Sequence, residues 1–197
     1  MPERLVNTDI RLFLWLNGHH SPFWDHIMWF ISGKAEWLPL YLILLGYIIY
    51  RFKWQSLSIL IAVIITITLA DQLAVKAFKE VFERLRPSHN PDIEQLVHIV
   101  NGYRGGAYGF VSNHAANSFA LAVFTSLLLR NKFYTAGILF WASLVSYSRI
   151  YLGVHYPGDI LGGAMLGSLI AWLVYSLFNR FSLFTLFLKH RNEKIKS

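Results

Sequence analysis

The sequence predicts an all-α membrane protein, a polytopic bundle of six transmembrane helices that is preceded by an interfacial helix. Of its 197 residues, 55% are hydrophobic and 15% are charged, whereas soluble domains carry roughly 25% charged residues. The charged residues occur in clusters, and long apolar runs without charges separate the clusters. We expect a single membrane-embedded domain over residues 1–197, because each apolar segment must pack against its neighbours in the bilayer.

The first span has the weakest pattern. Between residues 12 and 32 the apolar residues are interrupted by polar residues at positions 17–20, by Pro22 and by Asp25. We expect the first part of this segment to form the interfacial helix. Residues 23–32 would then belong to the first span.

The other five spans are charge-free runs. The first of these runs is shorter than the roughly 17–25 residues that a spanning helix needs, so it must include flanking residues or lie where the bilayer is thin. The other four reach or approach that length, and the last begins near Pro157, which suits the first position of a helix. The five runs are residues 37–50, 54–70, 107–129, 133–148 and 160–179.

Basic residues indicate the orientation of the bundle. Two short links, which contain Arg51 and Arg130, would lie on the same side as a basic C-terminal tail. Short basic links face the cytoplasm, so six crossings would place both termini there. The opposite, extracytoplasmic side would receive the long connection 83–110 and the turn 150–156.

Three polar clusters would then meet at the extracytoplasmic face. In the first, Lys79 and Arg86 are about two helical turns apart, so both would project from nearly the same face of a helix that ends beside Pro87. An ammonium and a guanidinium suit a phosphate dianion. A basic collar that only snorkels at the end of a span explains this cluster equally well when it is taken alone.

The second cluster, Ser112-Asn113-His114, opens the fourth span. Ser or Asn is a preferred N-cap residue, and free backbone N–H groups at a helix start bind anions. His114 would lie in the first turn, beside a phosphate bound there. Taken alone, His114 is better explained as a histidine at the wet membrane interface.

The third cluster contains Arg149, His155 and Asp159, between the fifth and sixth spans. Asp159 can reach back to His155 from the first turn of the last helix. A carboxylate bonded to Nδ1–H fixes the tautomer that leaves Nε2 free to attack. A His–Asp pair that only ties down a loop would not explain why Arg149 and the other two clusters converge at the same level of the membrane.

Residue types exclude some other chemistry. The chain has no cysteine, which excludes disulfides, thiol nucleophiles and thiolate metal sites. The acids Glu83, Asp92 and Glu94 lack a convincing metal-ligand spacing, and we expect neither a metal nor another cofactor. The formal net charge of +7 comes mostly from Lys and Arg residues that flank apolar runs, so we do not expect nucleic-acid binding.

Together the three clusters resemble the three-part signature of the type-2 phosphatidic acid phosphatase (PAP2) family. The matching patterns are Lys79-x6-Arg86-Pro87, Ser112-x-His114 and Ser148-Arg149-x5-His155-x3-Asp159. Their order and internal spacings agree with the family signature. The resemblance implies a six-span phosphatase that works without metal, here in a bacterial cell membrane with its active site on the extracytoplasmic side.

The resemblance also implies a role for each matching residue. His155 would attack phosphorus to form a phosphohistidine, Asp159 would orient it, and His114 would protonate the leaving oxygen. The phosphoryl oxygens would be bound by Lys79, Arg86, Ser112, Asn113 and Arg149. Where the family has Pro-Ser-Gly-His, this chain has Val111 and Asn113, and we expect Asn113 to adopt the left-handed geometry of the replaced glycine.

The expected substrate is a lipid phosphate or lipid diphosphate, with undecaprenyl diphosphate as the best specific candidate. Phosphatidylglycerophosphate, phosphatidic acid and lipid A 1-phosphate are the alternatives. A lipid-phosphate transporter or flippase would also keep the basic residues, but it would not need the His155–Asp159 pair. Asp71, in the third span, would pair either with a basic residue of the site or with Lys76.

Overall fold

The computed structural model describes residues 3–196, with side chains described for residue 4 and residues 6–181. The described residues are all-α, as expected, with one isolated bridge between Leu85 and Tyr108. The α-helices are α1 (Glu3–Asn17), α2 (Pro22–Ser32), α3 (Leu38–Phe52), α4 (Ser56–Leu73), α5 (Glu80–Phe82), α6 (Asn113–Leu129), α7 (Lys132–Tyr151) and α8 (Pro157–Lys196). A π-helix, η3 (Ala74–Lys79), joins α4 to α5, and short 3-10 turns are η1 (Ala35–Trp37), η2 (Lys53–Gln55), η4 (Pro87–His89) and η5 (Glu94–Leu96).

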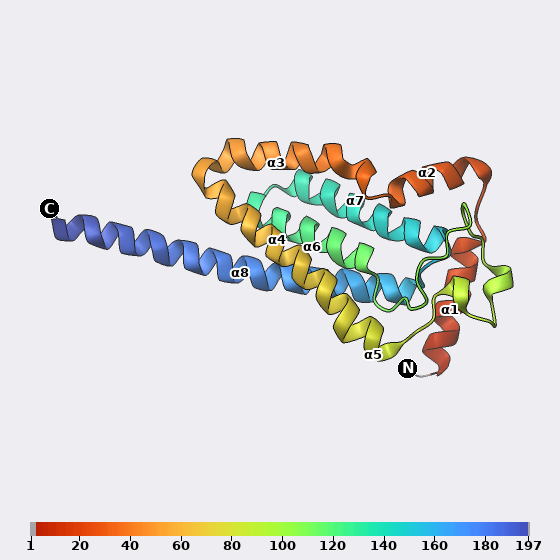
Figure 1. Cartoon of the computed structure of the whole chain (residues 1–197). Coiled ribbons are helices and arrows are strands. Elements are labelled where there is room, and N and C mark those ends of the chain that lie inside the picture. The colour runs from red at the N-terminus through yellow and green to blue at the C-terminus, as the bar shows by residue number, and fades with distance from the viewer. Residues whose placement is uncertain (1–2, 197) are drawn as a thin grey trace.

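Helix α6 is the centre of the bundle. It packs against α4, α7 and α8 (Figure 1), and small residues let the backbones approach closely. A Cβ atom added at Gly167 would lie 2.0 Å from the carbonyl oxygen of Ala116, and one at Gly163 would lie 2.5 Å from that of Ser112. These glycines therefore hold the start of α8 against the start of α6, where two of the predicted clusters lie.

Replacing Gly167 by leucine should destabilise the bundle, because α8 would have to move away from the backbone of α6. We expect a loss of about 1–3 kcal/mol or more, the range for overpacked cores, measured as a lower unfolding temperature in detergent. Gly137 on α7 is the matched control, since a Cβ atom there would meet nothing within 4 Å. Equal effects of Gly137→Leu and Gly167→Leu would contradict this packing.

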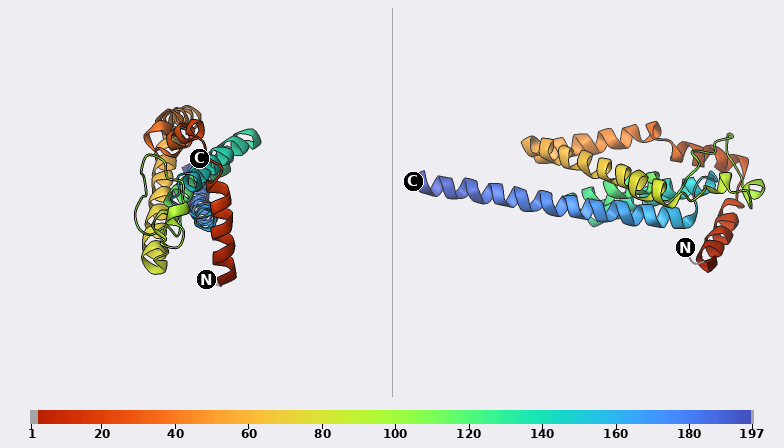
Figure 2. Two further views of the ribbon diagram at one scale, coloured as in Figure 1. Left: turned by 90° about the vertical axis from the view of Figure 1, so that its right-hand side faces the viewer. Right: turned by 60° about the horizontal axis from the view of Figure 1, so that its bottom comes forward.

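The first two bundle helices follow one another in the same direction. In Figures 1 and 2, α2 leads into α3, and α4, α6, α7 and α8 then alternate in direction. With 11 and 15 residues, α2 and α3 are about 16 and 22 Å long, and each is shorter than a hydrocarbon core of about 30 Å. The six predicted bundle helices are thus present, but α2 and α3 run in the same direction instead of alternating. Helix α1 lies across one end of the bundle and α8 runs out at the other (Figure 1), whereas six alternating crossings would bring both chain ends to one side.

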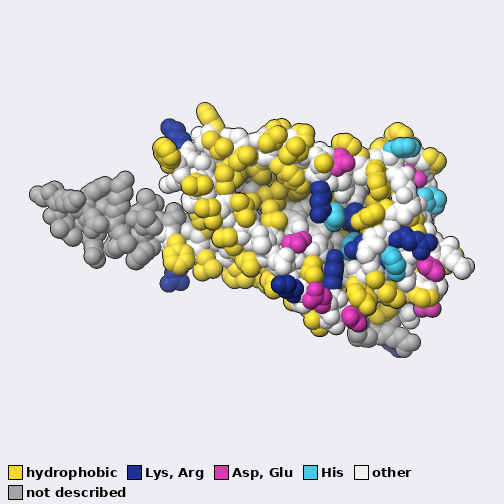
Figure 3. All heavy atoms as spheres, viewed as in Figure 1, with side chains coloured by type: hydrophobic (Ala, Val, Ile, Leu, Met, Phe, Trp, Pro, Cys, Tyr) yellow, Lys and Arg dark blue, Asp and Glu magenta, His cyan; other side chains and the backbone are white. Residues whose placement is uncertain are grey.

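Large apolar side chains cover the outside of the bundle. Trp54 is 97% exposed, Phe133 78% and Met165 73%, and Figure 3 shows apolar side chains over most of one face. Two helical stretches of the described chain, Ala35–Phe82 and Pro157–Phe181, are long and apolar enough to cross a membrane. An apolar exterior of this extent is suited to lipid rather than to water.

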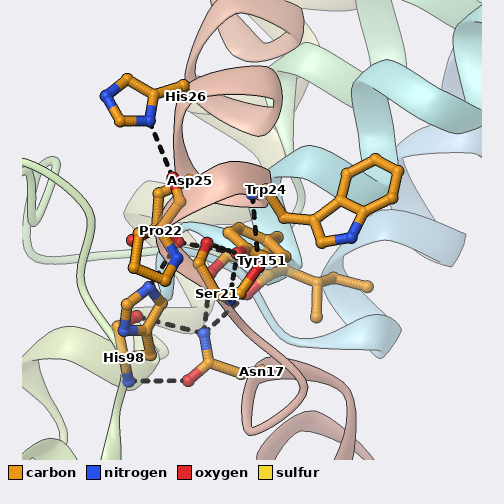
Figure 4. Close-up of polar contacts among 9 residues, drawn as sticks. Asn17, Ser21, Pro22, Trp24, Asp25, His26, His98 and Tyr151 are labelled. Atoms are coloured by element: carbon orange, nitrogen blue, oxygen red, sulfur yellow. Dashed lines mark hydrogen bonds and ion pairs between the residues drawn. The ribbon is translucent and has the colours of Figure 1, made fainter.

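A partly buried polar cluster attaches α1 and α2 to the end of α7 (Figure 4). The side-chain amide of Asn17 donates to the carbonyl oxygen of Tyr151 at 2.8 Å, and its oxygen accepts from the backbone N–H of His98 at 2.8 Å. Asp25 accepts from the Tyr151 hydroxyl at 2.7 Å and lies 2.9 Å from His98 Nε2. Because the last carbonyls of a helix lack intrahelical partners, Asn17 stabilises the end of α7 that carries Arg149.

Candidate active site

A cavity of about 590 Å³ opens between α3, α4, α6 and α7. We call it the main cavity. Its wall is mainly apolar, and Figure 3 shows Lys, Arg and His side chains around a hollow on this face. Six residues predicted from the sequence line the main cavity, namely Lys79, Arg86, Asn113, His114, Arg149 and His155.

The two arginines of the site are buried without a carboxylate partner. Arg86 is 8% exposed and Arg149 is 4% exposed, and no ion pair in the described part of the chain includes either residue. Arg86 Nη1 and Arg149 Nε are buried and have no hydrogen-bond partner. Burial and the charge of Arg149 lower the pKa of Arg86. Unpaired buried donors on two neighbouring cations create a strong site for an anion.

Other donors of the two arginines are fixed by polar neighbours. Arg86 Nε donates to the carbonyl oxygen of Tyr108 at 3.1 Å. Arg149 donates to the hydroxyl groups of Ser32 and, at 3.2 Å, Tyr103. These bonds orient both guanidinium groups before any anion arrives, which favours binding because little side-chain freedom remains to be lost.

His155 is the most deeply buried histidine of the site, with 1% exposure. Burial, followed by the charges of Arg86, Arg149 and Lys79, holds the pKa of His155 well below its usual range. The imidazole is therefore neutral near pH 7, as a nitrogen nucleophile must be.

Asp159 contacts the Nδ1 side of the His155 ring. Its Oδ2 lies 3.4 Å from His155 Nδ1, at the long end of the hydrogen-bond range, and accepts from the backbone N–H of Tyr156 at 3.0 Å. His155 lies two residues before α8, in which Pro157 occupies the first helical position and Asp159 the first turn, as the sequence predicted. The pair is thus positioned by local helix geometry.

Arg84 is a site residue that the sequence interpretation missed. It donates to Asp159 Oδ1 at 2.9 Å and to Asp9 Oδ2 at 2.7 Å, and its guanidinium carbon lies 4.0 Å from the ring centroid of Tyr156. Asp9 also accepts from the backbone N–H of Gly158 at 2.8 Å. Helix α1 is therefore connected to the His155–Asp159 pair through one arginine.

The prediction that Lys79 and Arg86 share one helix is wrong. Helix α5 ends at Phe82, and Glu83 adopts a left-handed conformation with φ 45°. Arg86 lies in extended backbone before Pro87, with ψ 157°, and its N–H donates to Ala107 at 2.9 Å. The pre-proline restriction acts at Arg86 as expected, but the helix has already ended, and a backbone pairing brings Arg86 to the cavity instead.

The second cluster begins a helix as expected, but Asn113 differs from the expectation. Ser112 is the N-cap of α6, and its hydroxyl accepts from the backbone N–H of Ala115 at 3.5 Å. Asn113 is the first helical residue, so the expected left-handed conformation is wrong. Its side-chain amide donates to Asp71 Oδ1 at 2.7 Å. Because Asn113 has helical backbone geometry, no glycine is needed at this position. Its side-chain amide is free to donate to Asp71.

Glycines in the long connection allow it to cover the site. Gly105 has φ +69°, and a Cβ atom there would lie 2.4 Å from Arg86 Nη1. A Cβ atom at Gly109 would lie 2.9 Å from Asp159 Oδ2. Only glycine permits this close approach of the backbone, so the loop packs directly against the two site residues.

A side cavity of about 310 Å³ adjoins the main cavity at His114 and Arg149. Lys34 and Tyr103, which the sequence interpretation missed, line both cavities. Trp29 also lines the side cavity, and its ring lies edge-on to that of Tyr103 at 5.8 Å. The site therefore lies between an apolar compartment and a compartment with aromatic and charged walls.

These residues can bind an anion and attack it. No group of three or more His, Asp or Glu side chains in the part of the chain that the structure describes is arranged to hold a metal ion. Three cations, a neutral imidazole and a second imidazole at one end of an apolar cavity suit a phosphoryl group carried by a lipid.

Comparisons with known proteins agree with this chemistry. The family model of the PAP2 superfamily matches residues 55–183. The chain is 46% identical over 178 residues to the lipid A 4'-phosphatase of Bacteroides thetaiotaomicron, covering 89% of this chain and 79% of that protein. It is 41% identical over 177 residues to the lipid A 4'-phosphatase of Porphyromonas gingivalis, covering 89% and 75%. The crystal structure of a transmembrane PAP2-type phosphatidylglycerolphosphate phosphatase from Bacillus subtilis aligns with a TM-score of 0.68 and 26% identity, covering 90% of this chain and 88% of that one.

Proposed function

Because this chain belongs to the PAP2 superfamily of membrane lipid phosphatases, we propose that it hydrolyses the 4'-phosphate of lipid A through a phosphohistidine on His155. The observation that carries the reaction is the pair of buried arginines without carboxylate partners, which lines the main cavity together with a neutral His155. A phosphate would supply the missing negative charge and accept the unpaired N–H groups.

The reaction proceeds in two displacements at phosphorus. In the first, His155 Nε2 forms a bond to phosphorus while the bond to the lipid oxygen breaks, and His114 gives a proton to that oxygen. In the second, His114 takes a proton from water, the water oxygen bonds to phosphorus, and the bond from phosphorus to nitrogen breaks. Lys79, Arg86 and Arg149 stabilise the charge on the three other oxygens.

The substrate assignment replaces the expectation of undecaprenyl diphosphate. The relatives from Bacteroides thetaiotaomicron and Porphyromonas gingivalis, 46% and 41% identical to this chain, are named lipid A 4'-phosphatases. Their names favour a phosphate monoester on a sugar lipid as the substrate. The two cavities suit such a molecule, with acyl chains in the main cavity and the sugar beside Trp29 and Tyr103.

The site would face the extracytoplasmic side. The turns with Arg51 and Arg130 lie at the end of the bundle away from the site (Figure 1), and short basic turns face the cytoplasm. We infer that α2 and α3 cross the bilayer together, so that α1 lies on the same side as the site and the end of α8 lies on the cytoplasmic side of a bacterial inner membrane.

A phosphate-release assay tests the proposed function. Purified protein in detergent should remove one phosphate from bis-phosphorylated lipid A, and fragment-ion mass spectrometry should place the loss at the 4' position. Release should persist in a metal chelator and exceed release from phosphatidylglycerophosphate, phosphatidic acid and undecaprenyl diphosphate. Loss of the 1-phosphate, or faster turnover of another lipid, would contradict the assignment, and lipid binding without turnover would favour a transporter.

A further inference from the structure

An acidic side chain lines the same cavity as the cations. Asp71, in the last turn of α4, contributes to the wall of the main cavity together with Lys79 and His114. A carboxylate repels a phosphate dianion, so its place in an anion-binding cavity needs another explanation. The side chains that bind Asp71 suggest this explanation.

Two amide groups of α6 fix one oxygen of Asp71. Asn113 Nδ2 donates to Asp71 Oδ1 at 2.7 Å, and Asn117 Nδ2 donates to the same oxygen at 3.0 Å. The carbonyl oxygens of both amides are buried without a partner, which is an unfavourable state for buried acceptors. Both amides are thus committed to orienting one carboxylate.

The second oxygen of Asp71 remains available. No hydrogen bond within the described residues engages Oδ2, since every bond to this side chain uses Oδ1. Asp71 binds residues on either side of His114 along α6, so its carboxylate lies at the same level of α6 as His114 and in the wall of the same cavity. Earlier in α4, the helix that carries Asp71, the side chains of Leu60, Val63 and Ile67 line the apolar part of the cavity.

We propose that Asp71 Oδ2 is an acceptor that recognises a hydrogen-bond donor of the lipid, an amide N–H or a hydroxyl, at the junction of head group and acyl chains. This inference rests on the proposed phosphatase function and names the class of lipid that the site prefers. Lipids with N-linked acyl chains or free hydroxyls near the phosphate satisfy Asp71. Lipids with only ester oxygens there place acceptors against a carboxylate, which is unfavourable.

A matched pair of substrates isolates this effect. Ceramide 1-phosphate and phosphatidic acid are both two-chain phosphate monoesters, but the first carries amide N–H and hydroxyl donors where the second carries ester oxygens. With equal acyl lengths in the same detergent, the wild-type protein should show a higher kcat/KM for ceramide 1-phosphate. The quantity to compare between variants is the ratio of the two kcat/KM values, because a general loss of activity cancels in it.

The variant Asp71→Asn should reverse the recognition without changing the shape of the side chain. Its carbonyl oxygen can still accept from Asn113 and Asn117, so its NH₂ group, a donor, would face the cavity in place of Oδ2. The ratio should fall roughly tenfold or more, the usual effect of losing a hydrogen bond to a charged group. Asp71→Ala should move the ratio toward one. Glu80→Ala is the control, since it removes an exposed acid from the same continuous helix and should leave the ratio unchanged.

Three results would overturn the inference. They are a wild-type ratio near one, an unchanged ratio in Asp71→Asn when both activities fall together, and an equal shift in Glu80→Ala. Failure of the lipid A assignment is a separate result, because the protein would then cleave the ceramide and glycerol lipids but release no 4'-phosphate from lipid A. A wild-type protein that cleaves none of these lipids would refute both.

Discussion

Replacing His155 by alanine should lower kcat for lipid phosphate hydrolysis by about 10⁴-fold or more, because the variant has no nucleophile to form the covalent intermediate. The wild-type protein should also form an acid-labile, base-stable phosphoprotein when it is quenched during turnover of a labelled substrate. This species should be absent from His155→Ala. Phosphate release and the labelled protein can be measured in the same quench experiment.

The control for His155→Ala is the same substitution at another histidine, His26. His26 is exposed and contacts only the carbonyl oxygen of Pro22, at 2.7 Å, among its described hydrogen bonds. His26→Ala should keep full activity and form the phosphoprotein. If His155→Ala kept a phosphoprotein and substantial turnover while its unfolding temperature was unchanged, the nucleophile would have to be a different residue.

Replacing Arg84 by methionine should lower both stability and activity. Asp159 is fully buried, and removing its arginine partner leaves a buried carboxylate without a compensating charge, a change that costs about 3–5 kcal/mol in proteins. The His155–Asp159 pair would also lose its alignment, so kcat should fall by about 10–100-fold with a smaller change in KM. Unfolding temperature and steady-state kinetics in detergent measure the two effects.

An exposed ion pair provides the control for Arg84. Arg104 lies 3.4 Å from Glu94, and their side chains are 51% and 39% exposed, so Arg104→Met should cost less than about 1 kcal/mol. Arg84→Lys should recover part of kcat because it keeps one charge beside Asp159. If kcat were the same in Arg84→Met and the wild type, Arg84 would have only a structural role.

The sequence was sufficient where the relevant geometry is local. His155 and Asp159 are four residues apart, and Pro157 marks the start of the helix that carries Asp159 and follows His155 directly. The helix that begins after Ser112 was likewise predicted, since N-cap preferences depend on neighbouring residues. Apolar runs predicted the bundle helices for the same reason.

Other features needed the tertiary structure. The sequence placed Lys79 and Arg86 on one helix, but the left-handed Glu83 and the pairing with residues 107–109 place Arg86 at the cavity instead. No local pattern distinguishes Arg84 from the other basic residues of its segment, and its partner Asp9 is 75 positions away.

The sequence alone, through its apolar runs and its resemblance to the PAP2 signature, predicted a helical membrane protein with a phosphate site built on two histidines and three cations. The tertiary structure decided the direction of α2, the partners of Arg84 and the orientation of Asp71. The physical reason is that the first group of properties depends on residues within one or two turns of each other. The second depends on contacts such as Asp71 with Asn117, 46 positions apart, which exist only after the helices have packed.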